Sequence, residues 1–382
     1  MRLRAFTIPI CAAAVLLSAC STSAVEPAAS TGASAPTQAL AAPMESLRGD
    51  LDTMVRAGAV GAIATLTGNG VTAVATAGHA DIATGTTIPV DRPQYVRVGS
   101  VTKTFTAAIL LQLAAEHRVD LDQPIDTYLP GLLRGDGVDG RAITVRQILG
   151  HRSGLPEPAP TPELNEYAAA RDGRTFTPAQ EIAIALELPA QFTPGARFHY
   201  NNINYIVAGM LIEAVTGHRY ADELRDRILT PLNMSNTYLP ATAETGLRQP
   251  HPTGYATLDG AVTDVTPMEP SLPWASGAMI STGADLNRFY TALLAGAVVP
   301  PTELGQMLAG SDMGNGDGMS YGLGLGYTQL PCGTEYVGNV GGVLGFTAIT
   351  GATTAGRAVT VSYTGTPTAV DIGAILTHAL CG

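Results

Sequence analysis

One serine and one lysine stand at a spacing that suits nucleophilic chemistry. The chain of 382 residues contains twenty arginines but a single lysine, Lys103, and Ser100 precedes it by three residues. Positions three apart share one face of a helix, which brings the hydroxyl group and the amine within hydrogen-bond distance. An amine can lose its proton and act as a base, whereas a guanidinium group in a protein cannot. The pair therefore predicts a serine nucleophile with a lysine base.

The residues after Lys103 predict that its amine is buried. Residues 103–117 are largely apolar on all sides, a pattern typical of a buried helix. The pKa of an exposed lysine is about 10.4, and burial lowers this pKa enough to leave some neutral amine. The helix N-terminus also places its positive dipole end near Ser100, where an oxyanion would develop. The alternative is a capping Ser100 and a solvated Lys103, which is disfavoured because cations are unfavourable at helix N-termini.

Four segments occur in the order known from one family. They are residues 97–107 (RVGSVTKTFTA), 143–156 (ITVRQILGHRSGLP), 194–205 (PGARFHYNNINY) and 275–286 (ASGAMISTGADL). In order and spacing they resemble the penicillin-recognising serine hydrolases, which include class C β-lactamases, D-alanyl-D-alanine carboxypeptidases and related esterases. The resemblance extends from about residue 44 to the end of the chain.

The resemblance assigns roles to two further side chains. Tyr200 and Asn202 fall on the Y-x-N segment of the family. The resemblance implies that Tyr200 joins the proton transfer, and a tyrosine beside a lysine can be pushed toward the phenolate. Asn202 is expected to bind the amide of the substrate or the lysine through its carboxamide.

The third family landmark is altered in this chain. The family carries Lys-Thr-Gly or His-x-Gly on an inner strand, and residues 338–342 (GNVGG) occupy that place here. Gly341 keeps the close backbone approach to the substrate, and the Gly342 N–H is expected to form an oxyanion hole with that of Ser100. Asn339 replaces the cation, so we expect a neutral substrate-binding group that receives a carboxylate less well. This change favours an esterase-like or other amidase role.

These residues predict a serine hydrolase that forms an acyl-enzyme on amide or ester bonds, of the D-alanyl-D-alanine carboxypeptidase or β-lactamase type. The expected substrate is a small molecule or peptide, such as a peptidoglycan-like peptide, a lactam or an ester. No cofactor or metal is expected, because the sequence contains no H-E-x-x-H motif and no Cys/His pairs at zinc spacing. The alternative is a catalytically weak or inactive cell-envelope binding lipoprotein of the same fold.

The N-terminal sequence predicts export and a lipid anchor. Residues 1–19 carry two arginines and then an apolar stretch too short to span a bilayer, as in a signal peptide. The residues before Cys20 resemble the lipobox of bacterial lipoproteins, so Cys20 is the expected lipidation site and the protein is expected on the outer side of the cell membrane. Cleavage after Ala19 without lipidation is the alternative. Residues 20–42 are rich in Ser, Ala, Thr and Pro and predict a disordered tether.

Charge and cysteine content restrict the partners and the compartment. The net charge of −11 comes without a basic cluster, which argues against nucleic acid as a partner. Cys332 and Cys381 are expected to form a disulfide if the compartment is oxidising, as the export signal indicates, with two buried thiols as the alternative.

The hydrophobic pattern predicts an α/β (α+β) fold of the serine β-lactamase type in residues 43–382. A helix is expected at 44–57 and a hairpin at 62–66 and 71–77 around Gly68-Asn69-Gly70. Helices are expected at 143–149, 178–188, 205–216 and 220–228, strands at 321–327, 334–337, 345–350 and 359–363, and a helix at 369–380. Both termini would then build one antiparallel sheet flanked by helices, with a mainly helical lobe inserted at about residues 95–300.

Overall fold

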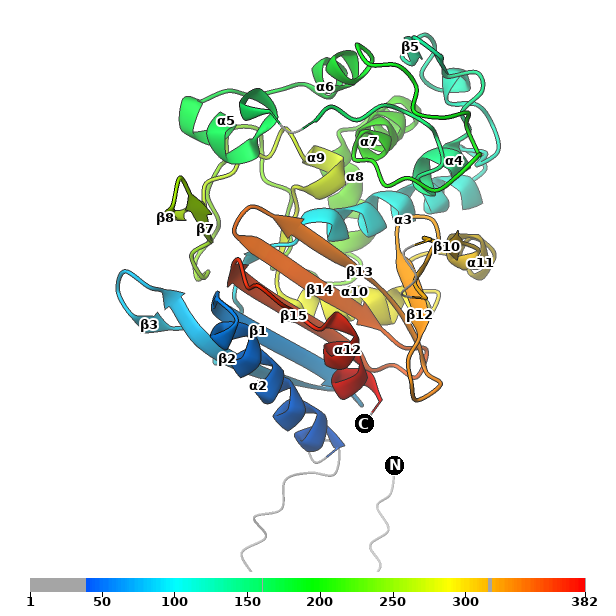
Figure 1. Ribbon diagram of the computed structural model, residues 1–382. Coiled ribbons are helices and arrows are strands. Elements are labelled where there is room, and N and C mark those ends of the chain that lie inside the picture. The colour runs from blue at the N-terminus through cyan, green and yellow to red at the C-terminus, as the bar shows by residue number, and fades with distance from the viewer. Residues whose placement is uncertain (1–38, 160, 315–317, 382) are drawn as a thin grey trace, which may run out of the picture. The chain divides into compact units, whose positions relative to one another are not determined.

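The computed structural model describes residues 39–159, 161–314 and 318–381 (Figure 1). The predicted signal peptide, Cys20 and most of the predicted tether lie outside the described residues. Within those three ranges, no helix combines the length and the apolar character that crossing a membrane requires.

Strands from both ends of the described chain form one antiparallel sheet, as the sequence predicted. Its order is β10-β11-β12-β13-β14-β15-β1-β2-β3, so β15 from the C-terminal part lies beside β1 (Figure 1). Within the described residues this sheet has nine strands, which are β1 (Ala59–Gly68), β2 (Val71–Asp81), β3 (Thr86–Thr87), β10 (Ser311–Asp312), β11 (Ser320–Tyr321), β12 (Gly326–Gln329), β13 (Glu335–Val343), β14 (Phe346–Ala352) and β15 (Ala358–Gly365). Short pairs are formed by β4 (Val96–Arg97) with β9 (Ile280–Ser281), β5 (Arg134–Gly135) with β6 (Val138–Asp139), and β7 (Tyr255–Leu258) with β8 (Ala261–Asp264).

The hairpin of β1 and β2 follows from its turn residues. Gly68 pairs with Val71, which leaves a two-residue loop of Asn69 and Gly70. Both loop residues have positive φ, 52° and 75°. A two-residue hairpin turn of this type needs positive φ at both positions, which Asn-Gly adopts readily.

Helices cover both faces of the sheet. The described helices are α2 (Ala41–Arg56), α3 (Thr102–Ala115), α4 (Val145–Leu149), α5 (Glu166–Asp172), α6 (Pro178–Ala185), α7 (Ile203–Thr216), α8 (Tyr220–Leu224), α9 (Trp274–Gly277), α10 (Gly283–Leu294), α11 (Pro301–Leu308) and α12 (Ile372–Leu380). The first helix α2 and the last helix α12 pack on one face, whereas α10 packs against β1, β14 and β15 from the other (Figure 1). Because both faces are covered, β1 is buried along nearly its whole length.

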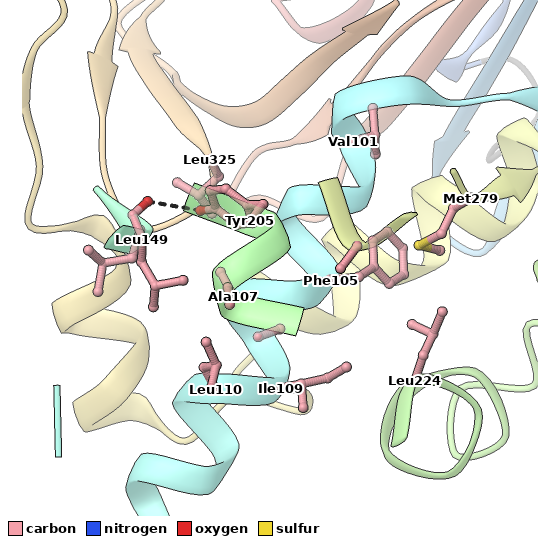
Figure 2. Packing of buried hydrophobic residues seen from close by; sticks show 14 of the residues in the cluster. Val101, Phe105, Ala107, Ile109, Leu110, Leu149, Tyr205, Leu224, Met279 and Leu325 are labelled. Atoms are coloured by element: carbon pink, nitrogen blue, oxygen red, sulfur yellow. Dashed lines mark hydrogen bonds between the residues drawn. The ribbon is translucent and has the colours of Figure 1, made fainter. Parts of the chain in front are cut away.

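Helix α3 lies at the centre of the larger hydrophobic core. It is buried from Thr102 through Leu111 and packs against α7, α9 and α11. Figure 2 shows its side chains among residues from the surrounding elements, with the hydroxyl of Tyr205 donating a 2.8 Å hydrogen bond to the carbonyl oxygen of Leu149. The burial predicted for this helix is confirmed from Lys103 through Leu111, while Glu116 and His117 lie after the helix and are exposed. The buried part fixes the Ser100 turn at the helix N-terminus.

Several predicted elements differ in their bounds. Residues 220–228 form the short helix α8 followed by a π-helical turn at Arg225–Leu229. The predicted strand at 321–327 is broken into β11 and β12, because the positive φ of Gly324 (86°) is incompatible with a continuous strand. The strand at 334–337 instead continues as β13 to Val343 through three glycines.

The last helix is tied to the sheet. The structure joins Cys332 and Cys381 in a disulfide, with their Cα atoms 5.7 Å apart. The bond links the residue after α12 to the turn between β12 and β13.

Candidate active site

The turn before α3 presents Ser100 and Lys103 on one side. Gly99–Val101 forms a single 3₁₀ turn that continues into α3 at Thr102. Lys103 has no exposed surface, and its Nζ lies 3.1 Å from Oγ of Ser100. The structure therefore places the predicted pair in direct hydrogen-bond contact.

Two further acceptors hold the amine of Lys103. Its Nζ donates to Oδ1 of Asn202 and to the backbone carbonyl oxygen of Ser276, each at 2.8 Å. Burial lowers the pKa of Lys103 to about 7, while the charge of Glu157 opposes the shift. A neutral amine has two hydrogens and one lone pair. With both hydrogens taken by these acceptors, the lone pair is left for the hydroxyl proton of Ser100.

Tyr200 completes the contacts of the serine. Its hydroxyl donates a 2.6 Å hydrogen bond to Oγ of Ser100, and Nζ of Lys103 lies 4.9 Å from the centre of its ring. Burial raises the pKa of Tyr200 well above the usual value, although the hydrogen bond with Ser100 opposes this. Burial therefore favours the neutral phenol in the free enzyme, in place of the phenolate considered from the sequence.

Asn202 connects the lysine to a carboxylate that the sequence did not single out. Its backbone N–H and its Nδ2 donate to Oε1 of Glu157 at 2.9 and 2.8 Å. These bonds turn Oδ1 of Asn202 toward Lys103. Glu157 follows the 143–156 segment directly, but no motif in the sequence marks it.

Glycines let strand β13 approach the serine turn. A Cβ on Gly341 would clash with the carbonyl oxygen of Val98 and lie 2.7 Å from the backbone nitrogen of Ser100. A Cβ on Gly99, whose φ is 51°, would lie 2.6 Å from the backbone nitrogen of Gly342. The structure thus brings the backbones of Ser100 and Gly342 together, where paired N–H groups can bind an oxyanion. The lack of a side chain at Gly341 allows this close approach of the two backbones.

Asn339 points into the protein, and its polar atoms are engaged there. Its Nδ2 donates to Oγ1 of Thr104 and to the carbonyl oxygens of Ser100 and Gly324 at 3.1–3.3 Å, while its Oδ1 accepts from the N–H of Val340 at 2.8 Å. Its exposed fraction is 8%. We therefore correct the assignment of Asn339 to substrate binding: its contacts support the turn that carries Ser100.

A cavity of about 320 Å³ opens in front of Ser100. Tyr200, Asn202, Ser276 and Gly342 border it with Ser100. Three carboxyl groups also line it, from Glu157, Glu166 and Glu181, whereas none of its lining residues is an arginine or a lysine. Glu166 and Glu181 come from α5 and α6, and their approach depends on the tertiary fold rather than on any local motif.

His151 is buried close to this site. Its Nδ1 contacts the backbone N–H of Asn201 at 3.2 Å and Nδ2 of Asn204 at 3.1 Å. Burial, with the charge of Lys103 as a second cause, lowers the pKa of His151 well below its usual value. A neutral ring that accepts from these amides positions the segment that carries Tyr200.

Comparison with known families agrees with this arrangement. A family model described as Beta-lactamase matches residues 38–378. The chain belongs to the beta-lactamase family. Members of this family of serine hydrolases share the mixed fold seen here, with an antiparallel sheet flanked by helices.

Similar proteins within this family include amidases. The structure of a D-stereospecific amidohydrolase from Streptomyces sp. is 35% identical, with a TM-score of 0.80 over 88% of this chain and 98% of that chain. The D-amino acid amidase from Ochrobactrum anthropi SV3, in complex with L-phenylalanine amide, is 28% identical, with a TM-score of 0.74 over 85% and 92%.

A fungal relative is also similar over part of its length. The unguisins hydrolase ungD of Aspergillus violaceofuscus (strain CBS 115571) is 32% identical over 230 residues. That match covers 57% of this chain and 39% of the relative, so this chain spans well under two thirds of that protein.

Proposed function

We propose that this chain is an amidohydrolase that cleaves amides or esters of amino acids through an acyl-enzyme on Ser100. One observation carries the proposal. The buried Nζ of Lys103 lies 3.1 Å from Oγ of Ser100, and the hydroxyl of Tyr200 lies 2.6 Å from the same oxygen. A nucleophile in contact with both a base and a proton donor suits acyl transfer.

In the acylation step, Oγ of Ser100 attacks the carbonyl carbon while its proton passes to the neutral Nζ of Lys103. The backbone N–H groups of Ser100 and Gly342 bind the resulting oxyanion. As the carbon–nitrogen bond breaks, the phenol of Tyr200 gives its proton to the leaving amine. Lys103 is then an ammonium group and Tyr200 a phenolate, and each stabilises the other's charge.

In the deacylation step, water attacks the ester carbon and its proton passes to the phenolate of Tyr200. The bond between the acyl carbon and Oγ of Ser100 then breaks, and the ammonium group of Lys103 returns a proton to Oγ. The acid product leaves, and all three side chains regain their starting protonation states.

The charges around the cavity support an amide or ester substrate without a free carboxylate. Three glutamates line the cavity, and its lining includes neither arginine nor lysine. The place where the family carries a cation holds Asn339, whose donors are engaged inside the protein. A carboxylate-bearing D-alanyl peptide or penicillin would lack a charged partner here. The D-selective amidases similar to this chain support D-amino acid amides as the substrate class.

A fluorophosphonate probe tests the mechanism, and D-phenylalanine amide tests the substrate class. We expect the probe to label the wild type at Ser100 and the amide to be hydrolysed, with both signals lost in Ser100→Ala. A matched control, Ser153→Ala, removes a buried serine whose hydroxyl contacts Asn204 instead. Equal labelling of wild type and Ser100→Ala would overturn the nucleophile assignment.

The export signal and lipid anchor predicted from the sequence remain part of the proposal. The supporting observation is the lipobox-like sequence that ends at Cys20. Mass spectrometry of the mature N-terminus, made in a bacterial host, is expected to find a diacylated Cys20, and Cys20→Ser is expected to release the protein from the membrane. An unmodified N-terminus at Cys20 would contradict the anchor.

A further inference from the structure

Glu181 is a buried carboxyl group at the end of the substrate cavity. It lies in the first turn of α6, its exposed fraction is 8%, and it lines the same cavity as Ser100. Its Oε1 is buried without a hydrogen-bond partner. An ionised carboxylate in such a place is costly unless a donor or cation reaches it.

The helix itself does not require this carboxyl group. The N-terminus of α6 is closed by a capping box between Thr177 and Gln180, whose side chains each bond the backbone N–H of the other. Glu181 adds nothing to that cap. A glutamine or an apolar side chain would satisfy the same position without a buried charge.

A second carboxyl group from another element faces the same end of the cavity. Glu166 begins α5, is partly buried and lies close enough for its charge to act on Glu181. Burial first, and then Glu166, raise the pKa of Glu181 to about 9. Burial also raises the pKa of Glu166. Glu157 is the third acid in the lining, and its charge acts on Lys103 behind Ser100, whereas no arginine or lysine lines the cavity beside Glu166 and Glu181.

We propose that Glu181 and Glu166 form a subsite that binds a positively charged side chain of the substrate. The inference rests on the proposed function and adds the identity of the preferred side chain, an ammonium or guanidinium group. A guanidinium group in the cavity would pair with the carboxyl group of Glu181 and offset the repulsion between the two carboxyl groups. A bare metal ion fits less well, because Ca²⁺ and Mg²⁺ take about six or more oxygen ligands.

Binding of the cation is coupled to proton release. In the empty cavity Glu181 holds its proton at neutral pH, and a bound guanidinium group favours its ionised form. Preference for a cationic substrate should therefore rise as the pH approaches 9. The other charged groups around the cavity, Glu157 and Glu166, are acidic as well and act in the same direction.

D-Arginine amide and D-citrulline amide form a matched pair for the test. They have the same α-amino group and similar shape, but only the side chain of D-arginine amide is charged over the whole pH range. In the wild type we expect kcat/KM to be about tenfold or more higher for D-arginine amide at pH 8, with a smaller ratio at pH 6. Glu181→Gln should bring the ratio close to one, because kcat/KM should fall far more for D-arginine amide than for D-citrulline amide. Glu187→Gln, which removes an exposed acid just after α6, should leave the ratio unchanged.

The outcomes separate this inference from the proposed function. Hydrolysis of both amides at equal rates by the wild type, or a ratio unaffected by Glu181→Gln, would overturn the cation subsite and leave the amidase intact. Hydrolysis of neither amide by a protein that the phosphonate labels would overturn the amidase proposal. The pH dependence of the kcat/KM ratio for the two amides is measured on the wild type. The proposal can therefore still be tested if a variant fails to fold.

Discussion

The backbone carbonyl oxygen of Ser276 accepts a 2.8 Å hydrogen bond from Nζ of Lys103. Asn202 supplies the second acceptor, and both are neutral. They hold the amine in place without the countercharge that would keep it protonated. Glu157 is hydrogen-bonded to Asn202 rather than to the amine, so its charge offsets the effect of burial only in part. This arrangement keeps Lys103 oriented and still able to act as a base.

Replacing Asn202 with Asp should raise the pH at which the enzyme becomes active. A carboxylate 2.8 Å from Nζ would stabilise the ammonium form of Lys103 and raise its pKa by about one to three units. Lys103 is then neutral only at higher pH, so the acid limb of the plot of kcat/KM against pH should move to higher pH. Asn202→Ala serves as the control, with a lower rate but no upward shift. An unmoved limb in Asn202→Asp would argue against Lys103 as the titrating group.

Tyr200→Phe should affect amides more than activated esters. The phenol delivers a proton to the leaving amine, whereas p-nitrophenolate leaves without one. We expect kcat on D-phenylalanine amide to fall by about 10²–10⁴-fold and kcat on a p-nitrophenyl ester of the same acid to fall far less. The two rates are measured on one preparation. Equal losses on both substrates would indicate that Tyr200 acts only in positioning Ser100.

Asn339→Ala should lower stability without changing substrate affinity. The variant leaves the N–H of Val340 without its side-chain acceptor and the carbonyl oxygen of Ser100 without the Asn339 donor, while the carbonyl oxygen of Gly324 keeps a hydrogen bond from Thr104. We expect a cost of about 1–3 kcal/mol in the free energy of unfolding. Urea unfolding measures the loss, and KM for D-phenylalanine amide is expected to stay within about twofold. A rise in KM with unchanged stability would restore the sequence-based assignment of Asn339 to substrate binding.

Glu181→Gln should become more stable relative to the wild type as the pH rises. The pKa of Glu181 is about 9 in the folded protein and lies near 4.5 when exposed. Between these values the folded state binds more protons than the unfolded state, so wild-type stability falls with increasing pH through this group. Glutamine removes that dependence. Thermal unfolding midpoints are measured for the wild type and both variants at pH 5 and pH 8. The difference between Glu181→Gln and the wild type is expected to grow from pH 5 to pH 8, whereas the difference for Glu187→Gln should stay the same.

Local patterns were sufficient to predict the Ser100–Lys103 pair, whereas Tyr200 and Asn202 were assigned through the family resemblance. The Ser100–Lys103 spacing, the apolar helix after it and the Asn69-Gly70 turn are local features, and the structure places each as expected. The antiparallel sheet built from both termini was also predicted correctly.

What the sequence missed depends on tertiary contacts. The carbonyl oxygen of Ser276 has no side-chain signature, and Glu157, Glu166 and Glu181 meet only because three separate segments fold around one cavity. The protonation state of Tyr200 was misjudged because burial cannot be read from a Y-x-N motif. The strand predicted at 334–337 was too short, because the glycines that let β13 approach the serine turn have no hydrophobic alternation.

The protonation state of Lys103 can be measured directly, because the chain has no other lysine. Protein labelled with [ζ-¹⁵N]lysine and carrying a lysine-free tag gives a single side-chain amine resonance, whose chemical shift is followed by NMR from pH 5 to pH 11. We predict a titration midpoint near pH 7, as expected for a buried amine held by neutral acceptors. A midpoint near the 10.5 of an exposed lysine would contradict the account, because the base would then be protonated at neutral pH.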